Sequence, residues 1–417
     1  MAETNMNPNT TTGLSAEMKT YYSDYLIDNA TPNLVHDQFG QKHPIPANGG
    51  KTINFRKFVP FTKASTPLSE GITPDGGSLS VTNVTSEVSQ YGYYVTLSDM
   101  LMLTAVDNTL VETTKLLGSQ AGTTLDTVTR EVLNSGTNVM YAGEKYARAY
   151  LDEKCKLTVD DIYRAARMLK SQNAPKIDGG YVAIIHPDVA YDLMRDPEWI
   201  DVNKYSGAEN IYSGEIGKIA GVRFVESTEA KTFTSKELVP GARQATVIGG
   251  APNEGETPNV GEPGEFLFLV AENFGENVLA NLIGEQISIT SLSEINDDTS
   301  TVVGLVTGVS DNLIHINVVA GDTDIIGDGC IISKSGAGKC GRTVYSTLVL
   351  GANAYGVTEV TGGGLEHIVK QLGSGGTGDP LNQRATAGWK GTKVAELLVD
   401  NYIIRIESAS TFEGSNN

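Results

Sequence analysis

The stretch NATPNLVHDQFGQK, residues 29–42, decides the fold because of what lies on either side of it. Before it, residues 14–28 carry apolar and aromatic side chains at steps of three and four, which predicts an amphipathic helix that Pro32 ends. These side chains are Leu14, Met18, Tyr21, Tyr22, Tyr25 and Leu26. After it, residues 51–59 alternate as a β-strand does. The Asn, His, Asp and Gln of the stretch form no catalytic set, so we interpret it as a junction between an arm helix and a strand.

Two strand-like runs form the next feature, residues 51–59 and 79–97. Apolar residues alternate with polar ones in both, which predicts a β-hairpin. The connection of about 19 residues between them is rich in Pro and Gly and longer than compact domains usually contain. A two-stranded hairpin is marginally stable in water. We therefore expect this extended hairpin to need a partner surface.

The hairpin is basic, although the chain has a formal net charge of -19. Between Gln38 and Ser69 there is no acidic residue. One interpretation is a solvated strand edge that lysines protect from aggregation. The other is docking on the acidic surface of an identical neighbour. The candidate subunit-interface residues are Lys51, Arg56, Lys57 and Lys63 of the hairpin, with Tyr21 and Tyr25 of the arm helix.

Further elements predict a mixed α+β fold. Apolar steps of three and four over residues 108–134 predict one long helix with a single buried stripe, about 40 Å long at 1.5 Å per residue. TVDDIYRAARMLKSQ, residues 158–172, predicts a helix with a capping box between Thr158 and Asp161. YVAIIHPDVAYDLM, residues 181–194, predicts a strand, a turn and a helix, and residues 402–407 predict a final strand.

The charge is concentrated in one tract. Residues 244–333 contain no Lys or Arg but 14 Asp and Glu. Short Val/Ile/Leu runs such as QISIT, STVVGLVTGV and LIHINVVA are divided by Gly, Asn and Asp there, which predicts a small acidic β-rich domain inserted into the host fold. An acidic surface disfavours sequence-specific or general binding to nucleic acid, because phosphates need clustered cations.

Three motifs imitate cofactor sites, and none meets its structural context. GSGGTG at 373–378, with Glu396 beyond it, lacks the helix that would hold a pyrophosphate. SKSGAGKC at 333–340 has Ser333 and Cys340 where a P-loop needs glycine and a hydroxyl. DTDIIGDG at 322–329 leaves a weak divalent-cation site open, but Ile326 and Ser333 occupy ligand positions. We expect no catalytic, cofactor or metal site.

The remaining candidates for chemistry are isolated. The five histidines, His36, His43, His186, His315 and His367, are scattered singly, and we expect each on the surface or in packing. Three cysteines, Cys155, Cys330 and Cys340, are too few for a disulfide framework and indicate a reducing compartment. The first residues show neither a signal peptide nor a membrane span, so we expect no membrane partner and synthesis in the cytoplasm.

Several long runs, in order, resemble one known family. They are NATPNLVHDQFGQKHPIPANGGKTINFRKF, TPLSEGITPDG, YVTLSDM, LDTVTREVLNSGTNV and GTGDPLNQRATAGWKG. They are similar to phage major capsid proteins typified by the capsid protein of coliphage N-four, over roughly residues 21–228 and 344–409. The resemblance implies the Hong Kong 97-like capsid fold.

That fold implies a division of the chain. Its parts would be an N-terminal arm (1–48), an extended β-hairpin loop (49–97), a peripheral domain with a long spine helix (98–180) and an axial domain in two parts (181–233 and 343–395). The acidic β-rich domain would be an insertion at 234–342 that projects outward, and 396–417 would return to the peripheral domain as a strand and tail.

The resemblance also implies a function and partners. Copies of the chain would assemble as hexamers and pentamers into the icosahedral head shell of a tailed double-stranded DNA phage, in the host bacterial cytoplasm. Too few residues precede the first helix for a fused scaffolding domain, so we expect a separate scaffolding protein, a portal protein and room for a decoration protein. Lys51, Lys57 and Lys63 lie where some such shells form Lys–Asn crosslinks. The alternatives are the shell of a cellular nanocompartment and a nucleotide-dependent enzyme.

Overall fold

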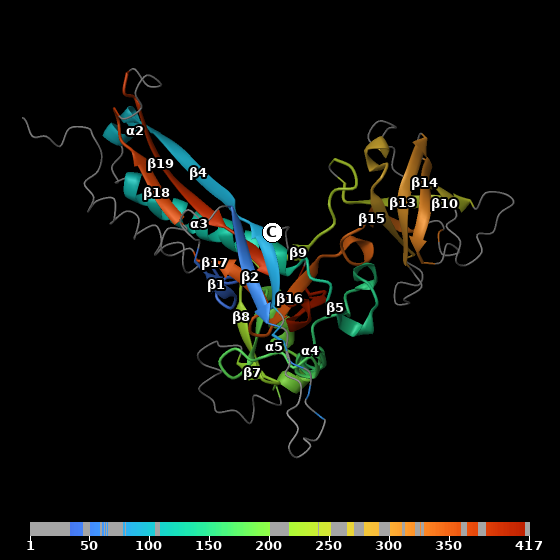
Figure 1. The fold of residues 1–417 in the computed structure, drawn as a ribbon. Coiled ribbons are helices and arrows are strands. Elements are labelled where there is room, and N and C mark those ends of the chain that lie inside the picture. The colour runs from blue at the N-terminus through green and yellow to red at the C-terminus, as the bar shows by residue number, and fades with distance from the viewer. Residues whose placement is uncertain are drawn as a thin grey trace, which may run out of the picture. The chain divides into compact units, whose positions relative to one another are not determined.

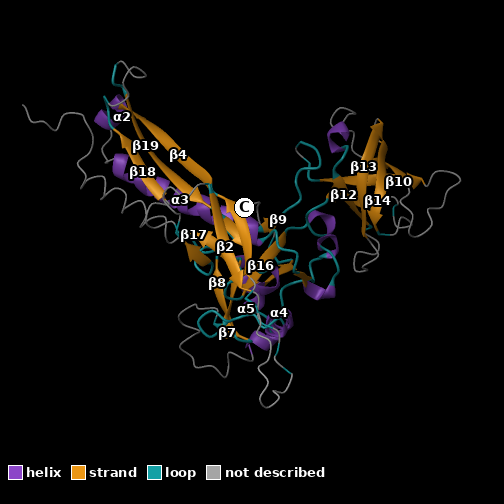
Figure 2. Ribbon diagram, in the orientation of Figure 1, coloured by secondary structure: helices purple, strands orange, loops and turns teal. Residues whose placement is uncertain are grey.

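The computed structural model describes about two thirds of the chain. The described residues are 34–44, 51–58, 61, 63, 65, 78–79, 81–104, 109–200, 217–240, 242–251, 265–270, 279–291, 301–310, 313–321, 326, 329–359, 365–373 and 381–412. They form two compact units, one of residues 1–135 and 352–400 and the other of residues 136–351 and 401–417. Strands outnumber helices in both (Figure 2), which confirms the α+β class. The predicted arm helix with Tyr21 and Tyr25 lies outside the described residues.

The first unit is built on a long helix against an antiparallel sheet (Figure 1). Leu117, Ala121 and Leu125 of the helix pack against Trp389 of the sheet. The Trp389 indole Nε1 also donates to Gln120 Oε1 at 2.6 Å. The sheet order is β18-β19-β4, so β4 and β18 are its edge strands. The elements are β4 (Ser89–Ser98), α2 (Asp99–Thr104), α3 (Thr109–Leu133), β18 (Leu365–Lys370) and β19 (Arg384–Lys393).

A hairpin and a small sheet complete this unit. β2 and β3 pair antiparallel from Thr52↔Glu87 to Phe58↔Val81. Phe55 is fully buried, and its ring lies so close to β17 that a Cβ at Gly356 would be 2.5 Å from two ring carbons. Glycine is therefore needed at that position of β17. The elements are β1 (Gln41–His43), β2 (Thr52–Phe58), β3 (Val81–Glu87), β17 (Tyr355–Thr358) and β20 (Ala395–Leu397), with sheet order β1-β17-β20.

The second unit contains a seven-stranded mixed sheet with two helices. β6 is buried along its whole length, as a strand covered on both faces must be. The α4 residues Ile162 and Leu169 share the core with Val189 and Leu193 of α5. The sheet order is β5-β21-β16-β6-β8-β7, with β9 paired to β16. The elements are β5 (Val139–Tyr141), α4 (Val159–Ser171), β6 (Tyr181–Ile185), α5 (Pro187–Met194), β7 (Lys218–Ile219), β8 (Val222–Glu226), β9 (Thr232–Phe233), β16 (Val344–Leu350) and β21 (Ile403–Ser408).

Local sequence signals explain both helices of this unit. The Thr158 hydroxyl accepts from the Asp161 amide while the Asp161 carboxylate accepts from the Thr158 amide, so the predicted capping box is confirmed. α5 begins with Pro187 after the His186 side chain, which accepts from the Asp188 amide at 3.2 Å. The predicted strand, turn and helix over 181–194 are confirmed as well.

The acidic tract folds as a closed β-barrel. Its strand order is β10-β11-β14-β13-β12-β15, and its interior is filled by apolar side chains such as Ile287, Ile289, Val302, Ile314 and Ile332. A closed barrel leaves no unpaired strand edge. The three strands predicted from QISIT, STVVGLVTGV and LIHINVVA are β12, β13 and β14. The elements are β10 (Gln244–Ala251), β11 (Glu265–Val270), β12 (Gln286–Thr290), β13 (Thr301–Ser310), β14 (Leu313–Ala320) and β15 (Ile331–Lys334).

Short 3-10 helices connect several strands. They lie at Ala142–Glu144, Arg148–Tyr150, Ala280–Leu282, Lys339–Gly341 and Asp400–Tyr402. Among the described helices, none combines the length and the apolar character that crossing a membrane requires.

One expectation from the sequence is wrong. Residues 79–97 form two strands, because the chain leaves one sheet at Val88 and enters another. The final strand, β21, pairs with β16 and with β5, and β5 lies within residues 98–180, to which 396–417 was expected to return. β17, β18 and β19 belong to the unit of the long helix. Strand partners are set by three-dimensional packing, which local alternation does not encode. The division of the chain into arm, hairpin loop, peripheral domain and axial domain stays a prediction.

Candidate assembly surfaces

The basic hairpin is anchored at its root and exposed along its charged side. Ile53 and Phe55 are buried with Val394 and Leu398, and the Phe55 ring meets the His43 ring edge-on at 5.0 Å. Lys51, just before β2, and Arg56, on β2, are exposed, and Lys63 is exposed beyond the strand. Within the described residues none of these three forms an ion pair.

The structure describes the side chains of three of the six predicted interface residues. Arg56 lies on β2, Lys51 directly precedes this strand, and Lys63 lies in the long connection beyond it. Lys57 lies on β2, but its side chain is outside the described set, as are Tyr21 and Tyr25. The charge pattern identified an exposed strand, but alternation alone did not indicate how deeply its other face is anchored.

Large apolar side chains are exposed at the far end of the three-stranded sheet. Met100, Leu101 and Leu103 of α2 have relative exposures of 62%, 45% and 81%, and Leu381 just before β19 has 76%. The Asp99 amide donates to the Gln383 carbonyl at 3.1 Å, which joins α2 to the segment that leads into β19. Exposed apolar clusters of this kind mark interaction surfaces.

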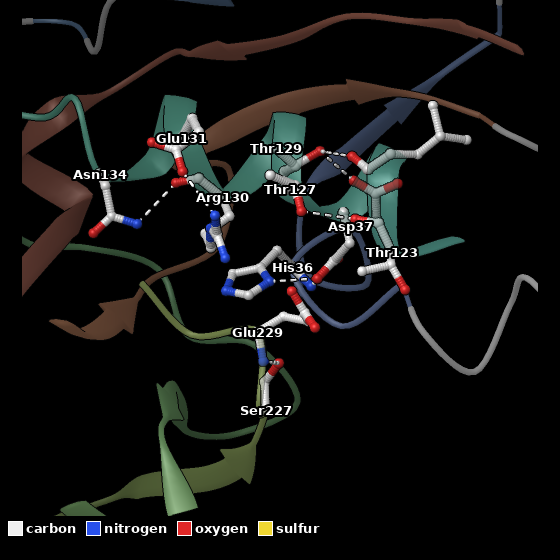
Figure 3. A network of polar contacts seen from close by, with 12 residues as sticks. His36, Asp37, Thr123, Thr127, Thr129, Arg130, Glu131, Asn134, Ser227 and Glu229 are labelled. Atoms are coloured by element: carbon white, nitrogen blue, oxygen red, sulfur yellow. Dashed lines mark hydrogen bonds and ion pairs between the residues drawn. The ribbon is translucent and has the colours of Figure 1, made fainter. Parts of the chain in front are cut away.

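A buried polar network fixes the junction between the arm and the hairpin, and sequence reasoning missed it. His36 Nδ1 lies 2.6 Å from Asp126 Oδ2 on α3, and the His36 amide donates to Asp126 Oδ1 at 2.7 Å. Both side chains are fully buried. Because a carboxylate only accepts, Nδ1 must carry the proton. Figure 3 shows His36 reaching the helix in this way.

The next residue of the chain joins two further elements. The Asp37 carboxylate pairs with the buried Lys393 ammonium of β19. It also accepts from the Thr129 hydroxyl of α3 at 2.6 Å (Figure 3). The hydroxyl of fully buried Tyr355 donates to the His36 carbonyl, and burial raises the pKa of this phenol well above its usual value. Residues 36 and 37 thus tie the junction to α3, β17 and β19.

This network corrects the prediction of a single apolar stripe on the long helix. The buried face of α3 includes Asp126, Thr129 and Arg130 beside Leu125 and Leu133. Hydroxyls of the threonine-rich middle are satisfied locally: Thr127 donates to the Thr123 carbonyl at 2.8 Å. The spacing of apolar residues does not reveal a buried polar row. The residues that form it, His36 and Asp37 in the junction and Asp126 in the helix, could nevertheless be seen in the sequence.

In the second unit, buried charge joins the last strand to its surroundings. Glu407 is fully buried and receives two bonds of 2.6 Å from Arg148, while Arg405 Nε lies 2.9 Å from the same carboxylate. The Arg148 guanidinium also stacks 3.5 Å above the centre of the Phe233 ring. Two cations hold one buried anion, which makes this cluster structural.

A second acidic side chain of this unit clasps the C-terminal segment. Asp192 of α5 accepts from the Ser410 hydroxyl at 2.7 Å and from the amide and hydroxyl of Thr411 at 2.8 and 2.5 Å. Lys156 lies 3.5 Å from it. Burial alone would raise the pKa of Asp192, but the bonds from Thr411 and Ser410 and the Lys156 charge outweigh it, so the pKa is lowered.

The rejected motifs have no site geometry in the described residues. Lys339 of SKSGAGKC is buried, and Ile326 of DTDIIGDG faces the barrel core. No group of three His, Cys, Asp or Glu that could hold a metal occurs in the part of the chain that the structure describes. Burial and the bond to Asp152 raise the pKa of Cys155 to about 11, so that thiol stays protonated near neutral pH. Burial lowers the pKa of His186 and of His367.

Comparison with known proteins decides the identity of this architecture. Residues 82–271 match a family model described as phage capsid protein. The fold is similar to the capsid of Ralstonia phage GP4, with a TM-score of 0.52, 13% identity and all of both chains covered. Residues 82–271 therefore belong to the phage capsid protein family, and the chain has the fold of a phage capsid.

Further capsid structures share the fold at low sequence identity. The capsid of cyanophage Pam1 gives a TM-score of 0.52 at 10% identity, with 99% of this chain and 98% of that chain covered. The capsid of cyanophage P-SCSP1u gives 0.50 at 12% identity, with 89% and 87% covered. The search of curated proteins gives no match. The Hong Kong 97-like fold expected from the sequence is confirmed.

Proposed function

We propose that this capsid protein assembles as hexamers and pentamers into the head of a tailed double-stranded DNA phage, and that it does so without catalysis. The observation that carries the proposal is the hairpin β2–β3. Phe55 anchors one face of β2, while Arg56 on the other face and Lys51 just before the strand stay exposed. A strand pair held at one face and charged on the other is suited to docking.

Charge supports an identical neighbour as the docking partner. The hairpin is basic, but the whole chain carries a formal charge of -19. A second copy therefore offers an acidic surface, and complementary charge accelerates encounter and fixes orientation. Many equivalent contacts of this kind close a shell even when each is weak.

The partners and the place of assembly extend this proposal. A separate scaffolding protein, a portal protein and a decoration protein would act with the shell in the host bacterial cytoplasm. The barrel would project outward from the shell, since it is a closed acidic module with its own core. A particle map with barrel density on the inner wall would refute that orientation. A nanocompartment shell of the same fold is less well supported, because the family match is to phage capsids.

Charge reversal tests the docking role. Lys51→Glu with Arg56→Glu should abolish or strongly reduce closed particles in electron micrographs, while the unassembled chain keeps its melting temperature, because both side chains are exposed. Lys176→Glu, at an exposed lysine of the second unit, is the matched control and should assemble normally. Normal particles from the double variant would refute the proposal.

A further inference from the structure

We propose that the free edge of β4 receives an extended strand from a second copy of this chain, so that the three-stranded sheet continues across a subunit boundary. This inference rests on the self-assembly proposed above and adds the place and mode of one contact. Its first basis is topology. All ten residues of β4 pair with β19, from Ser89↔Lys393 to Ser98↔Arg384. No strand among the described residues pairs with the opposite edge, and Figure 1 shows β4 as an outer strand.

The second basis is the absence of edge protection in the β4 sequence. SQYGYYVTLS contains no charged residue and no proline. Soluble proteins normally blunt a long edge with lysine, proline or a bulge, because its unpaired amides and carbonyls are a template for another chain. The same sheet follows that rule at its other edge, where β18 exposes Glu366 and Lys370. The two edges of one sheet therefore differ in the feature that decides whether a strand can be added.

The third basis is the side chains along the edge. Tyr93 and Tyr94, in the middle of β4, are 54% and 70% exposed. Tyr94 lies over Gly388 of β19, where an added Cβ would be 2.8 Å from the Tyr94 Cβ. Aromatic residues gain from cross-strand neighbours, so an added strand would cover surface that is otherwise in water. The exposed apolar residues of α2 continue this surface directly after Ser98.

Charge and concentration favour a second copy as the source of the strand. The sheet face turned away from α3 carries Lys370, Arg384 and Lys390, against one acid, Glu366, which pairs with Lys390 at 3.3 Å. A basic sheet face attracts a chain whose net charge is -19. Strand addition draws its affinity from main-chain hydrogen bonds, and a shell holds its copies side by side at high effective concentration.

Crosslinking within assembled particles tests the source of the strand. Tyr94→p-benzoylphenylalanine keeps an aromatic ring and makes it photoreactive. Particles should be assembled from an equal mixture of normal and 15N-labelled chains, irradiated and digested. We expect crosslinked peptide pairs in which about half combine a light and a heavy chain, as random mixing of copies requires.

The outcomes separate this inference from the shell proposal. Crosslinks found only between two light or two heavy peptides would show that the partner of the β4 edge comes from the same copy. Particles without any crosslink would show that the edge is exposed to solvent. Either result overturns strand addition but leaves the shell function intact. Failure of the unmodified chain to form any particle would overturn both.

Edge lysines give a second, independent test. Gln90→Lys with Thr96→Lys places charges at two exposed positions on one face of β4. We expect the particle yield to fall by roughly tenfold or more while the melting temperature of the unassembled chain is unchanged. Gln371→Lys, exposed just after β18 at the already charged edge, is the control and should assemble as the wild type does. A wild-type yield from the β4 variant would overturn the proposal.

Discussion

The barrel and the first unit solve the problem of strand edges in opposite ways. The barrel closes six strands around an apolar interior, so every strand has two partners. The first unit keeps open sheets, with β4 and β18 at the edges of one and a separate two-stranded hairpin. Closed sheets are self-sufficient, whereas open edges can be extended by another chain.

The two regions also differ in how charge is used. The tract 244–333 has 14 acidic residues and no Lys or Arg. In the first unit, polar partners are buried in pairs: His36 is hydrogen-bonded to Asp126, and Asp37 forms an ion pair with Lys393. Buried pairs cost much when one partner is lost, whereas surface charge mainly affects solubility and encounter. The difference indicates that the buried pairs of the first unit hold the junction in one position, whereas the barrel folds as a separate module.

The largest expected effect comes from breaking a buried pair in the first unit. Lys393→Met would leave the Asp37 carboxylate buried with the Thr129 hydroxyl but without its cation. We expect this to destabilise the unit by about 3–5 kcal/mol. Urea unfolding of the unassembled chain, followed by circular dichroism, measures it.

The double variant Asp37→Leu with Lys393→Met is the control for this prediction. It removes both charges and should recover most of the lost stability, because apolar replacements of a buried pair are often neutral. If the single and double variants unfold alike, the pair is not a coupled unit.

A smaller effect is expected where the hairpin meets its sheet. Gly356→Ala would place a Cβ 2.5 Å from the Phe55 ring and force the hairpin outward. Overpacking of this kind costs about 1–3 kcal/mol. The free energy of unfolding and the particle yield should both fall. Adding Phe55→Leu should restore part of both, and no recovery would show that the strain lies elsewhere.

A still smaller effect is expected where Asp192 accepts hydrogen bonds from Ser410 and Thr411. This prediction tests whether polar contacts of the second unit contribute as much to stability as those of the first. Asp192→Asn retains one carbonyl acceptor, so we expect a loss of about 1 kcal/mol at neutral pH. The folded pKa of Asp192 is lowered, so its stabilisation is full above the unfolded value of about 3.9 and is lost as pH falls through the folded value. Melting at pH 7 and at pH 3 should show the difference from wild type shrinking in acid. An unchanged difference would contradict the assignment.

Removal of the barrel should have the smallest effect on assembly. The chain enters on β10 and leaves on β15, and these strands pair at Gln244↔Ser333. A two-residue turn can therefore replace residues 245–332 without separating the flanking chain. We expect particles of normal diameter in electron micrographs. Loss of assembly would show that the barrel takes part in contacts between copies and is not a self-sufficient module.

The sequence predicts local elements far better than their partners. The long helix, the capping box at Thr158 and the three barrel strands followed from periodicity and spacing, because those signals are local. The pairing of β21 with β16, and of β4 with β19, did not follow, since any buried alternating strand is equally suited to several neighbours.

The candidate surfaces were predictable in part for the same reason. The run of lysines and arginine marked the exposed strand β2, because charge is read directly from residue type. The anchoring of Phe55 over Gly356 depends on residues about 300 positions apart in the chain, which no spacing rule connects. The contact of Asp37 with Lys393 was missed likewise, although His36 and Asp37 stood within the stretch that indicated the family.

The adjacent pair His36 and Asp37 has one more consequence, which concerns accuracy of alignment. His36 meets Asp126, and Asp37 meets Lys393. If the junction slipped by one residue in one direction, Asp37 would lie beside Asp126 and Gln38 beside Lys393; in the other direction, His36 would lie beside Lys393 and Val35 beside Asp126. Either slip would break both contacts and leave a charge buried without its partner. The two neighbouring residues therefore favour one alignment of the junction and disfavour alignments shifted by one residue, within each subunit and before subunits associate.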